Sequence, residues 1–323
     1  MSRRRLCLVR PPLDLAPWTW LPGLGPLDLE GAAPYKPGMM TTAPLAFLKM
    51  HGLGNDFVIV DRRVDARPLP AATIAAIGNR RTGVGCDQFI TLSPGDGEVD
   101  VVMGIFNGDD GSVSGACGNA TRCVAHLLMQ ETGKAEVAIR TAAGILRGWR
   151  DAASGLVTVD MGPARLEWSQ IPLAEPRDTL HAGLSVGPLH DPVCVSMGNP
   201  HAVFFVPDVA AVDLPAVGPQ VERHPLFPER TNVEIVQVID RAHVRMRVWE
   251  RAAGITMACG SGACAVGVAC VRRGLTDRRV EVRLDGGALT IEWRDADGHV
   301  LMTGPVATAF AGRIDLGLLP VSA

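Results

Sequence analysis

An internal duplication constrains the fold of this 323-residue chain more than any other feature. The Gly-Asn-Asp-Phe of 54–57 has a counterpart 144 positions later, in the Gly-Asn-Pro-His of 198–201. The Ala-Cys-Gly of 116–118 recurs at 258–260, an offset of 142. Two weaker matches keep the same order and spacing: Ile105-Phe106-Asn107 with Val248-Trp249-Glu250, and the Gly-Pro steps at 162–163 and 304–305. Four matches in one order at nearly one offset indicate two similar halves.

The duplication predicts two domains, in line with about 150 residues per domain. The first is expected to span 44–163 and the second 164–305. The segment 306–316 follows the second Gly-Pro step, and we expect it to return to the first domain as a strand. The fold class is therefore α+β with two pseudo-symmetric halves. The two Gly-Pro steps are hypothetical hinges between them.

Local patterns predict that each half is rich in strands and has one central helix. Apolar, β-branched and alternating runs predict strands at 99–106, 156–159, 244–249 and 288–293, and another begins within 41–52. Small and apolar residues without proline predict buried helices at 117–129 and 259–271, which end near Gly133 and Gly274. A weaker helix is predicted at 71–77.

Composition excludes several classes of function. The formal net charge is −3, with no basic excess, so a nucleic-acid partner is not expected. No run of 18 or more apolar residues is present, so we expect no membrane span. The proline-rich segment 1–43 shows no helical or strand period, and we expect a disordered N-terminal extension. Its start lacks the apolar core of a signal peptide, which favours a cytoplasmic location and free thiols.

Two of the eight cysteines occupy equivalent places in the two halves. Cys117 and Cys259 each stand at the start of a predicted central helix, and a pseudo-twofold axis would bring these helix starts face to face. Helix N-termini present unpaired N–H groups and the positive end of the dipole, which favours a bound carboxylate and a lowered thiol pKa. We therefore expect the backbone near Gly118-Asn119 and Gly260-Ser261 to grip a carboxylate.

A carboxylate held between two thiols has its Cα between a base and an acid. One thiolate could remove the Cα proton while the opposite thiol delivers a proton to the other face, which inverts the centre without a metal or pyridoxal cofactor. A single Ala-Cys-Gly is more typical of a tight turn, but its duplication favours the catalytic interpretation. The remaining cysteines are interpreted as core or inert positions: Cys7, Cys86, Cys123, Cys194, Cys264 and Cys270.

These residues match the motifs of a known family. From about residue 45 to the C-terminus it resembles diaminopimelate epimerase, a cofactor-independent family with two catalytic cysteines. The motifs that carry the resemblance are, in order, His51-Gly52-Leu53-Gly54-Asn55-Asp56-Phe57, Gly85-Cys86-Asp87-Gln88, Ala116-Cys117-Gly118-Asn119-Ala120-Thr121-Arg122-Cys123, Met197-Gly198-Asn199-Pro200-His201, Arg230-Thr231-Asn232-Val233, Trp249-Glu250-Arg251-Ala252-Ala253-Gly254 and Ala258-Cys259-Gly260-Ser261-Gly262-Ala263-Cys264.

The resemblance implies a fold and a set of roles. Each half would be a β-barrel-like sheet around its central helix. Cys117 and Cys259 would be the catalytic pair, assisted by Glu250 and His201. The substrate-binding residues would be the backbone clamp Gly118, Asn119, Gly260 and Ser261, the amino-group ligands Asn55 and Gln88, and the distal-end ligands Asn107, Asn199, Asn232, Glu250 and Arg251. The reaction would interconvert LL- and meso-diaminopimelate, without a metal or other cofactor, in a possible homodimer.

The chain departs from the family pattern in one loop. Ten positions separate Asn107 from Cys117, where the family usually has nine, and the extra residue falls in a turn-rich loop. Plainer interpretations exist for several residues. Asn55 and Asn199 could cap turns, Gln88 could be a surface residue, His201 a buried structural histidine, and Glu250-Arg251 an ion pair.

Three rival functions are open at this point. A related two-thiol epimerase could act on hydroxyproline or histidine, although the distal-end set favours a long substrate with two zwitterionic ends. A dithiol redox protein could use Cys117 and Cys259, but it would have no use for the glycine-rich clamp. A non-catalytic amino acid binding protein would not need two equivalent cysteines.

Overall fold

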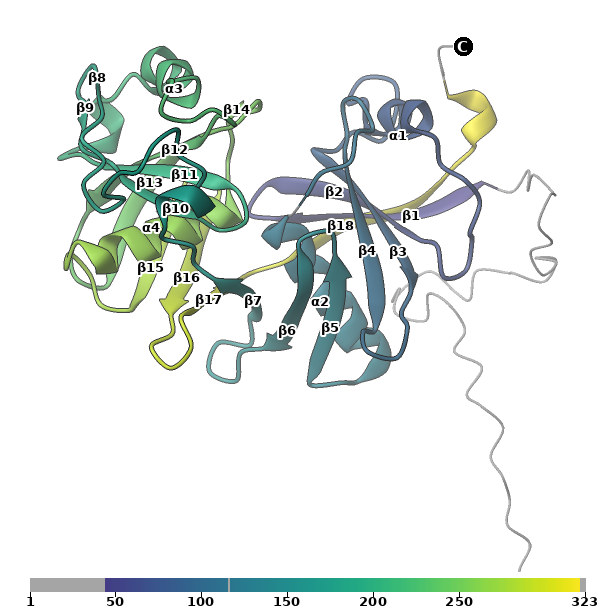
Figure 1. The fold of residues 1–323 in the computed structure, drawn as a ribbon. Helices are drawn as coiled ribbons and strands as arrows, with labels where there is room; N and C mark the ends of the chain where they lie inside the picture. Colours follow the sequence, from purple (N-terminus) through teal and green to yellow (C-terminus); the bar gives the residue numbers. More distant parts are fainter. Residues whose placement is uncertain (1–43, 116, 320–323) are drawn as a thin grey trace, which may run out of the picture.

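A computed structural model describes residues 44–115 and 117–319 as two lobes side by side (Figure 1). The expected disorder of 1–43 lies outside the described residues. The first lobe contains β1 Leu45–Gly52, β2 Asn55–Asp61, α1 Ala71–Gly78, β3 Gln88–Pro94, β4 Val101–Asn107, α2 Gly118–Thr132, β5 Glu136–Thr141, β6 Gly144–Arg150 and β7 Val157–Pro163. None of the helices in this described part is long and apolar enough to cross a membrane.

The second lobe has the same kinds of element, and after it the chain returns to the first lobe. It contains η1 Trp168–Gln170, β8 Ser185–Val186, β9 Leu189–His190, β10 Val193–Ser196, β11 Pro200–Phe205, η2 Val209–Ala211, α3 Leu214–Glu222, β12 Asn232–Val238, β13 His243–Glu250, β14 Gly254–Ile255, α4 Gly260–Arg272, β15 Arg279–Leu284, β16 Gly287–Trp293 and β17 His299–Gly304. The last strand, β18 Ala307–Ile314, pairs antiparallel with β1 of the first lobe, and η3 Leu316–Leu318 follows it.

Strand pairing repeats between the lobes. The neighbours β1 to β7 pair in the order antiparallel, parallel, antiparallel, parallel, antiparallel, antiparallel. The neighbours β10, β11, β12, β13, β15, β16 and β17 pair in that same order. The duplication inferred from sequence therefore extends to the topology. The two series join where β7 pairs antiparallel with β17, so the lobes share one continuous sheet.

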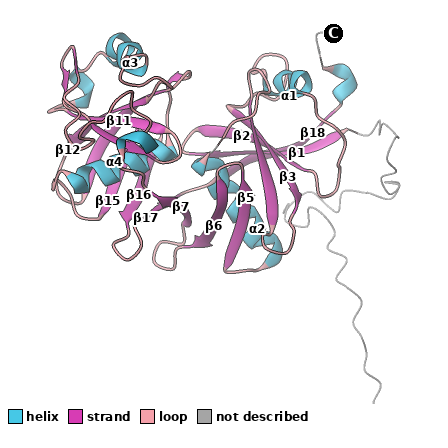
Figure 2. Cartoon of the chain, in the orientation of Figure 1, coloured by secondary structure: helices cyan, strands magenta, loops and turns pink. Residues whose placement is uncertain are grey.

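Each lobe curves around its central helix (Figure 2). Helix α2 contacts β1, β5, β6 and β7, and α4 contacts strands from β10 to β17. The packing is close because small residues face the sheet. A Cβ on Gly148 would lie 2.6 Å from the Ala125 Cβ of α2, and one on Gly267 of α4 would lie 2.6 Å from Ile291 Cγ2. The runs without proline therefore bury almost every side chain of α2 and α4, as the composition predicted.

Cys117 and Cys259 are the N-caps of the two central helices. The Cys117 Sγ accepts a hydrogen bond from the Ala120 N–H at 3.4 Å, and the Cys259 Sγ accepts one from the Gly262 N–H at 3.3 Å. Each cysteine therefore takes the N-cap role that serine or aspartate usually fills. Gly133 ends α2 in the left-handed conformation, with φ of 69°. The predicted helix starts are confirmed to within one residue.

The predicted strands and the weak helix at 71–77 are confirmed, but α3 was missed. Its sequence Leu-Pro-Ala-Val-Gly-Pro-Gln-Val-Glu carries two prolines and a glycine, which lower its helix propensity. Asp213 caps its N-terminus by accepting from the Ala216 N–H at 3.3 Å. The helix is stabilised by burying Leu214, Val217 and Val221 in the second lobe, which is a tertiary effect.

The β7–β17 pairing generates a prediction about the seam between the lobes. Thr158 and Thr303 are directly opposite, both buried, and their hydroxyls are 2.7 Å apart. Replacing either threonine by valine leaves a buried hydroxyl without its partner, so T158V or T303V should each lower the free energy of unfolding by about 1–2 kcal/mol. The double variant should recover most of that loss.

Urea denaturation measures all three variants, with Thr290→Val of the neighbouring strand β16 as a control expected within about 0.5 kcal/mol of the parent. Additive losses in the double variant would contradict the coupling.

Candidate active site

The N-termini of α2 and α4 meet at the seam between the lobes. The Asn119 side chain of α2 donates from Nδ2 to the Ala258 carbonyl, one residue before Cys259, at 3.3 Å. A Cβ on Gly260 would lie 3.3 Å from Asn119 Oδ1, and one on Gly118 would lie 2.8 Å from the Met302 methyl. Cys117 is half-buried and Cys259 is buried, with 4% of its surface exposed. The facing arrangement expected for the two helix starts is therefore what the structure contains.

The expected lowering of the thiol pKa values is wrong for the free protein. Burial raises the pKa of Cys117 to about 12, although the backbone N–H groups of Ala120 and Asn119 act in the opposite direction. Burial also raises the pKa of Cys259 well above its usual range, and the nearby Glu250 and Glu234 carboxylates add to this. Desolvation outweighs the helix N-terminus here because the thiols have little water around them. Both thiols are protonated at neutral pH.

The first thiol is held beside Asn55. The Cys117 Sγ lies 3.6 Å from Asn55 Oδ1, which also accepts from Asn119 Nδ2 at 3.2 Å. Asn55 is fixed in turn because its Nδ2 donates to Asp87 Oδ2 at 2.9 Å. Asp87 belongs to a charged cluster in which Arg80 bonds both Asp56 and Asp87, and Lys49 pairs with Asp56 at 2.6 Å. Asn55 therefore contacts both the Cys117 thiol and the Asn119 amide, and does more than cap a turn.

A chain of hydrogen bonds leads from the second thiol into the core. Cys259 Sγ is 3.6 Å from Ser261 Oγ, which accepts from Asn199 Nδ2 at 3.2 Å. Asn199 Oδ1 is 3.0 Å from His201 Nε2, and His201 Nδ1 is 2.7 Å from Glu234 Oε1. His201 and Glu234 are both fully buried. His201 thus reaches Cys259 through two side chains rather than by direct contact.

Glu250 lies at the same thiol. Its carboxylate accepts a hydrogen bond from the Thr256 hydroxyl. Burial raises the pKa of Glu250, and the Thr256 hydroxyl and the neighbouring Cys259 thiol partly offset this rise. A carboxyl group with a raised pKa is well suited to hold a proton taken from the adjacent thiol.

Two further expected ligands, Gln88 and Asn107, lie on neighbouring strands of the first lobe. Gln88 of β3 stands directly opposite Asn107 of β4. Gln88 Nε2 is 3.4 Å from Ser114 Oγ, and its buried Oε1 has no partner among the described residues, so Gln88 is not a plain surface residue. Asn107 Nδ2 donates to Ser112 Oγ at 2.9 Å. Both serines belong to the longer loop before Cys117.

Asn232 and Arg251 are joined to each other and to the backbone. Asn232 Nδ2 donates to the Pro200 carbonyl at 2.9 Å, and its Oδ1 accepts from the Arg251 N–H at 2.9 Å. The Arg251 guanidinium is exposed and donates to the Glu229 carbonyl at 3.1 Å. Within 44–115 and 117–319, it forms no ion pair with Glu250, so that alternative interpretation is wrong.

Sequence reasoning missed four supporting residues. Glu234 accepts from His201, Thr256 donates to Glu250, Asp87 holds Asn55, and Arg122 donates to Asn119. Glu234 carried a signal, since it interrupts the apolar run 233–236 of a strand, and Arg122 stands among small residues in a predicted core helix. Nothing local marks Thr256. It meets Glu250 only because β14 folds back on β13.

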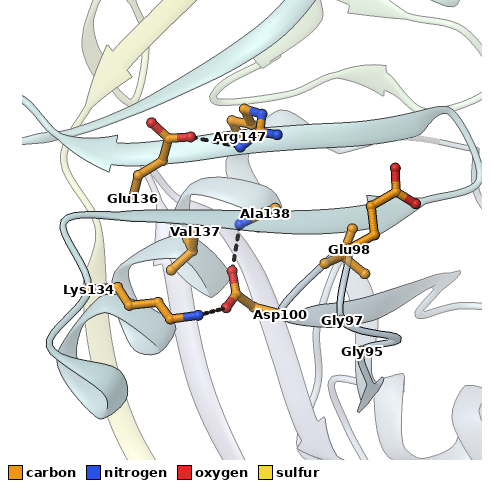
Figure 3. A pocket seen from close by; sticks show the side chains of 10 residues that line it. Gly95, Gly97, Glu98, Asp100, Lys134, Glu136, Val137, Ala138 and Arg147 are labelled. Carbon is orange, nitrogen blue, oxygen red and sulfur yellow. Dashed lines mark hydrogen bonds and ion pairs between the residues drawn. The ribbon is translucent and has the colours of Figure 1, made fainter.

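A groove that the structure shows lies away from these residues. A groove of about 450 Å³ beside β5 is lined by Gly95, Gly97, Glu98, Val99, Asp100, Lys134, Glu136, Val137, Ala138 and Arg147. Its charged side chains are already paired, Lys134 with Asp100 and Arg147 with Glu136 (Figure 3). None of the expected site residues lines it. Among the described residues, no group of three or more His, Cys, Asp or Glu side chains is arranged to hold a metal ion.

Comparison with known proteins identifies the family of the chain. A sequence model described as diaminopimelate epimerase matches residues 47–167 and 193–309, one segment in each lobe. The chain belongs to the diaminopimelate epimerase family. It is 61% identical over 277 residues to the diaminopimelate epimerase of Rhodospirillum centenum, which covers 85% of this chain and 94% of that protein. It is 52% identical over 279 residues to the one from Caulobacter vibrioides, covering 83% and 96%.

Solved structures extend the fold beyond this family. A hydroxyproline epimerase from Agrobacterium vitis aligns over 85% of this chain and 94% of its own, with a TM-score of 0.61 and 17% identity. A methylitaconate-delta-isomerase aligns over 88% and 99%, with a TM-score of 0.58 and 13% identity. At such low identity these similarities show the shared fold alone.

The raised thiol pKa values generate a prediction for the free protein. At pH 7.5, iodoacetamide should alkylate Cys117 at least about tenfold more slowly than it alkylates reduced glutathione, because the thiolate is scarce. The rate should keep rising up to pH 10 without levelling near the ordinary thiol pKa of about 8.5. Peptide mapping by mass spectrometry assigns the label, and C117A is the control. A plateau below pH 9 would contradict the raised pKa.

Proposed function

We propose that this protein interconverts LL- and meso-diaminopimelate by two-base proton transfer at Cα, as an isomerase of lysine and peptidoglycan precursor biosynthesis. The observation that carries the proposal is the pair of cysteines at facing helix N-termini, in a chain 61% identical to a diaminopimelate epimerase. The proposed substrate is a small amino acid, and the two-thiol chemistry requires no metal or pyridoxal cofactor.

The proposed chemistry begins with the reacting carboxylate between the two helix N-termini. The N–H groups near Gly118-Asn119 and Gly260-Ser261 would bind it and stabilise the charge that develops when the Cα proton leaves. Asn55 and Gln88 would bind the reacting amino group. The distal end would be bound by Asn107, Asn199, Asn232, Glu250 and Arg251. The unpartnered Gln88 Oε1 supports its assignment, because a substrate ammonium would satisfy it.

Glu250 supports a route to the thiolate at Cys259. The carboxylate accepts the thiol proton, leaving Cys259 as thiolate and Glu250 as a neutral acid. Cys259 then takes the Cα proton while the Cys117 thiol gives its proton to the opposite face, and the reverse reaction exchanges the two roles. Each turnover leaves one thiol protonated and the other ionised, so proton exchange with solvent restores the starting state. His201 is proposed to assist through Asn199 and Ser261.

We further propose two domains, 44–163 with 306–316 and 164–305, that close on the substrate and exclude water. A cytoplasmic homodimer is also proposed. The half-exposed Phe310 on β18, at the end of the sheet order, is compatible with a protein contact there.

The first test is turnover in D2O. Reduced protein incubated with LL-diaminopimelate should yield the meso form with deuterium at the inverted Cα. C117A and C259A should each lose at least about 10²-fold in kcat, the usual contribution of a positioned acid or base. Cys123→Ala and Cys264→Ala are matched controls, since both are buried thiols of the same two helices. Full activity in either catalytic variant would overturn the two-thiol mechanism.

The same assay separates the rival substrates. Turnover of hydroxyproline or histidine, with none of LL-diaminopimelate, would reassign the enzyme within its fold. Amino acid binding without any Cα exchange would favour a binding protein.

A second test uses the pH dependence of kcat/KM. The Thr256 hydrogen bond lowers the pKa of Glu250 against the effect of burial. Thr256→Val removes that bond, so Glu250 should stay protonated to higher pH and the acidic limb of the kcat/KM profile should move upward. Activity should be lost mainly on the acidic side and recovered at alkaline pH. A uniform loss at every pH would contradict a proton-accepting role for Glu250.

A further inference from the structure

Arg122 is a buried cation directly behind the two helix N-termini. Its side chain belongs to α2 and is fully buried. The guanidinium donates from Nη1 to Asn119 Oδ1 at 2.9 Å, and from Nε and Nη2 to the Pro305 carbonyl at 3.3 and 3.2 Å. Nη1 also lies 3.6 Å from the Met302 sulfur. These acceptors are all neutral, and no carboxylate of residues 44–115 or 117–319 forms an ion pair with it.

A buried charge without a counter-charge is costly, so its position needs an explanation. Two glycines make room for the guanidinium. A Cβ on Gly52 of β1 would lie 2.6 Å from Arg122 Nη2, and one on Gly304 of β17 would lie 3.4 Å from Arg122 Cζ. The slot is therefore formed by one strand from each lobe. Arg122 belongs to the first lobe, while Met302, Gly304 and Pro305 lie at the end of the second.

The guanidinium determines which way Asn119 points. Arginine has only donors, so the Asn119 atom facing it must be the carbonyl oxygen. The amide nitrogen is then directed to Asn55 Oδ1 and to the Ala258 carbonyl. Asn119 thus connects the residue beside Cys117 to the residue before Cys259. The hydrogen bond from Arg122 fixes the orientation of Asn119, and the Arg122 guanidinium is itself held by the Pro305 carbonyl, just after the last strand of the second lobe.

The charge also acts on the thiol. Burial raises the pKa of Cys117 and the Glu250 carboxylate adds to this rise, whereas the Arg122 charge is one of the effects that oppose it. A fixed positive charge in a low-dielectric site favours both a thiolate and a bound carboxylate nearby.

We propose that Arg122 is a positioning residue for the epimerase site. Its guanidinium holds Asn119 in the bridging orientation and binds the segment 302–305 at the end of the second lobe. It also supplies a permanent positive charge behind both helix N-termini. This inference rests on the proposed function. It has two separable parts, a geometric one that needs the forked guanidinium and an electrostatic one that needs only a cation.

Two variants separate these parts. Arg122→Met keeps much of the side-chain bulk without the charge, and Arg122→Lys keeps the charge without the fork. R122M should slow Cys117 alkylation at pH 8.5 by about threefold to tenfold and lower kcat by about 10²-fold. R122K should return alkylation to near the parent rate, yet leave kcat about tenfold or more below it, because one ammonium cannot hold Asn119 and Pro305 together.

The control is Arg272→Met at the far end of α4. Arg272 is a half-buried arginine that also donates to backbone carbonyls, those of Thr179 and Cys194. R272M should change the free energy of unfolding without changing the alkylation rate of Cys117 or kcat. Circular dichroism and urea denaturation establish that each variant is folded. If R122M does not fold, Gly52→Ala is the second perturbation, because its Cβ would lie 2.6 Å from Arg122 Nη2 and must shift the guanidinium, while the side chain keeps its positive charge. It should lower kcat without slowing alkylation.

The outcomes divide clearly. The proposal would be overturned if folded R122M had the kcat and the alkylation rate of the parent. If R122M does not fold, a parent-like kcat in folded G52A would overturn it instead. Full recovery of kcat by R122K would overturn the geometric part alone. Absence of turnover in the parent protein would instead overturn the proposed function. The alkylation rates would still test the charge of Arg122 in that case.

Discussion

The site depends on the contact between the N-termini of α2 and α4. Two helices that start at one seam bring their positive ends together, which is unfavourable unless an anion or a set of acceptors lies between them. In this protein the Asn119 amide spans the gap, from Asn55 to the carbonyl of Ala258. The helices are held there by the antiparallel pairing of β7 with β17, which makes one sheet of two lobes. A carboxylate substrate would fit this charge distribution.

The two thiols have different surroundings, although they arise from one duplicated motif. Cys117 faces Asn55 and lies near Arg122, whereas Cys259 faces Ser261 and Glu250, with Glu234 nearby. The Glu250 carboxylate raises the pKa of both thiols, but the Arg122 charge opposes this at Cys117, whereas the Glu234 carboxylate adds to it at Cys259. Part of this asymmetry lies within the repeat itself, because Asn119 and Ser261 occupy equivalent positions with different side chains. It is compatible with an epimerase whose two substrates are not mirror images.

Several parts of the fold could be predicted because their signals are local. The cysteines that start α2 and α4 were identifiable from the duplication, and the strand at 243–250 from its alternation. Helix α3 was missed because its stability comes from burying Leu214 and Val221 against other elements, in spite of two prolines. Asp87 could not be assigned because it binds Asn55, which is distant in the chain. Thr256 could not be assigned because only a turn brings it close to Glu250.

By itself, the sequence determined the duplicated organisation, the two cysteines at equivalent helix starts and, through its motifs, the family. These properties are carried by residue identity and spacing. Only the tertiary structure decided the protonation of the thiols and the partners of Asn119, His201 and Glu250. A helix N-terminus alone would lower a thiol pKa, but the packing of the two lobes removes water from both sulfurs, and desolvation is the larger effect. That balance depends on how completely the site is buried, and burial is a property of the folded chain.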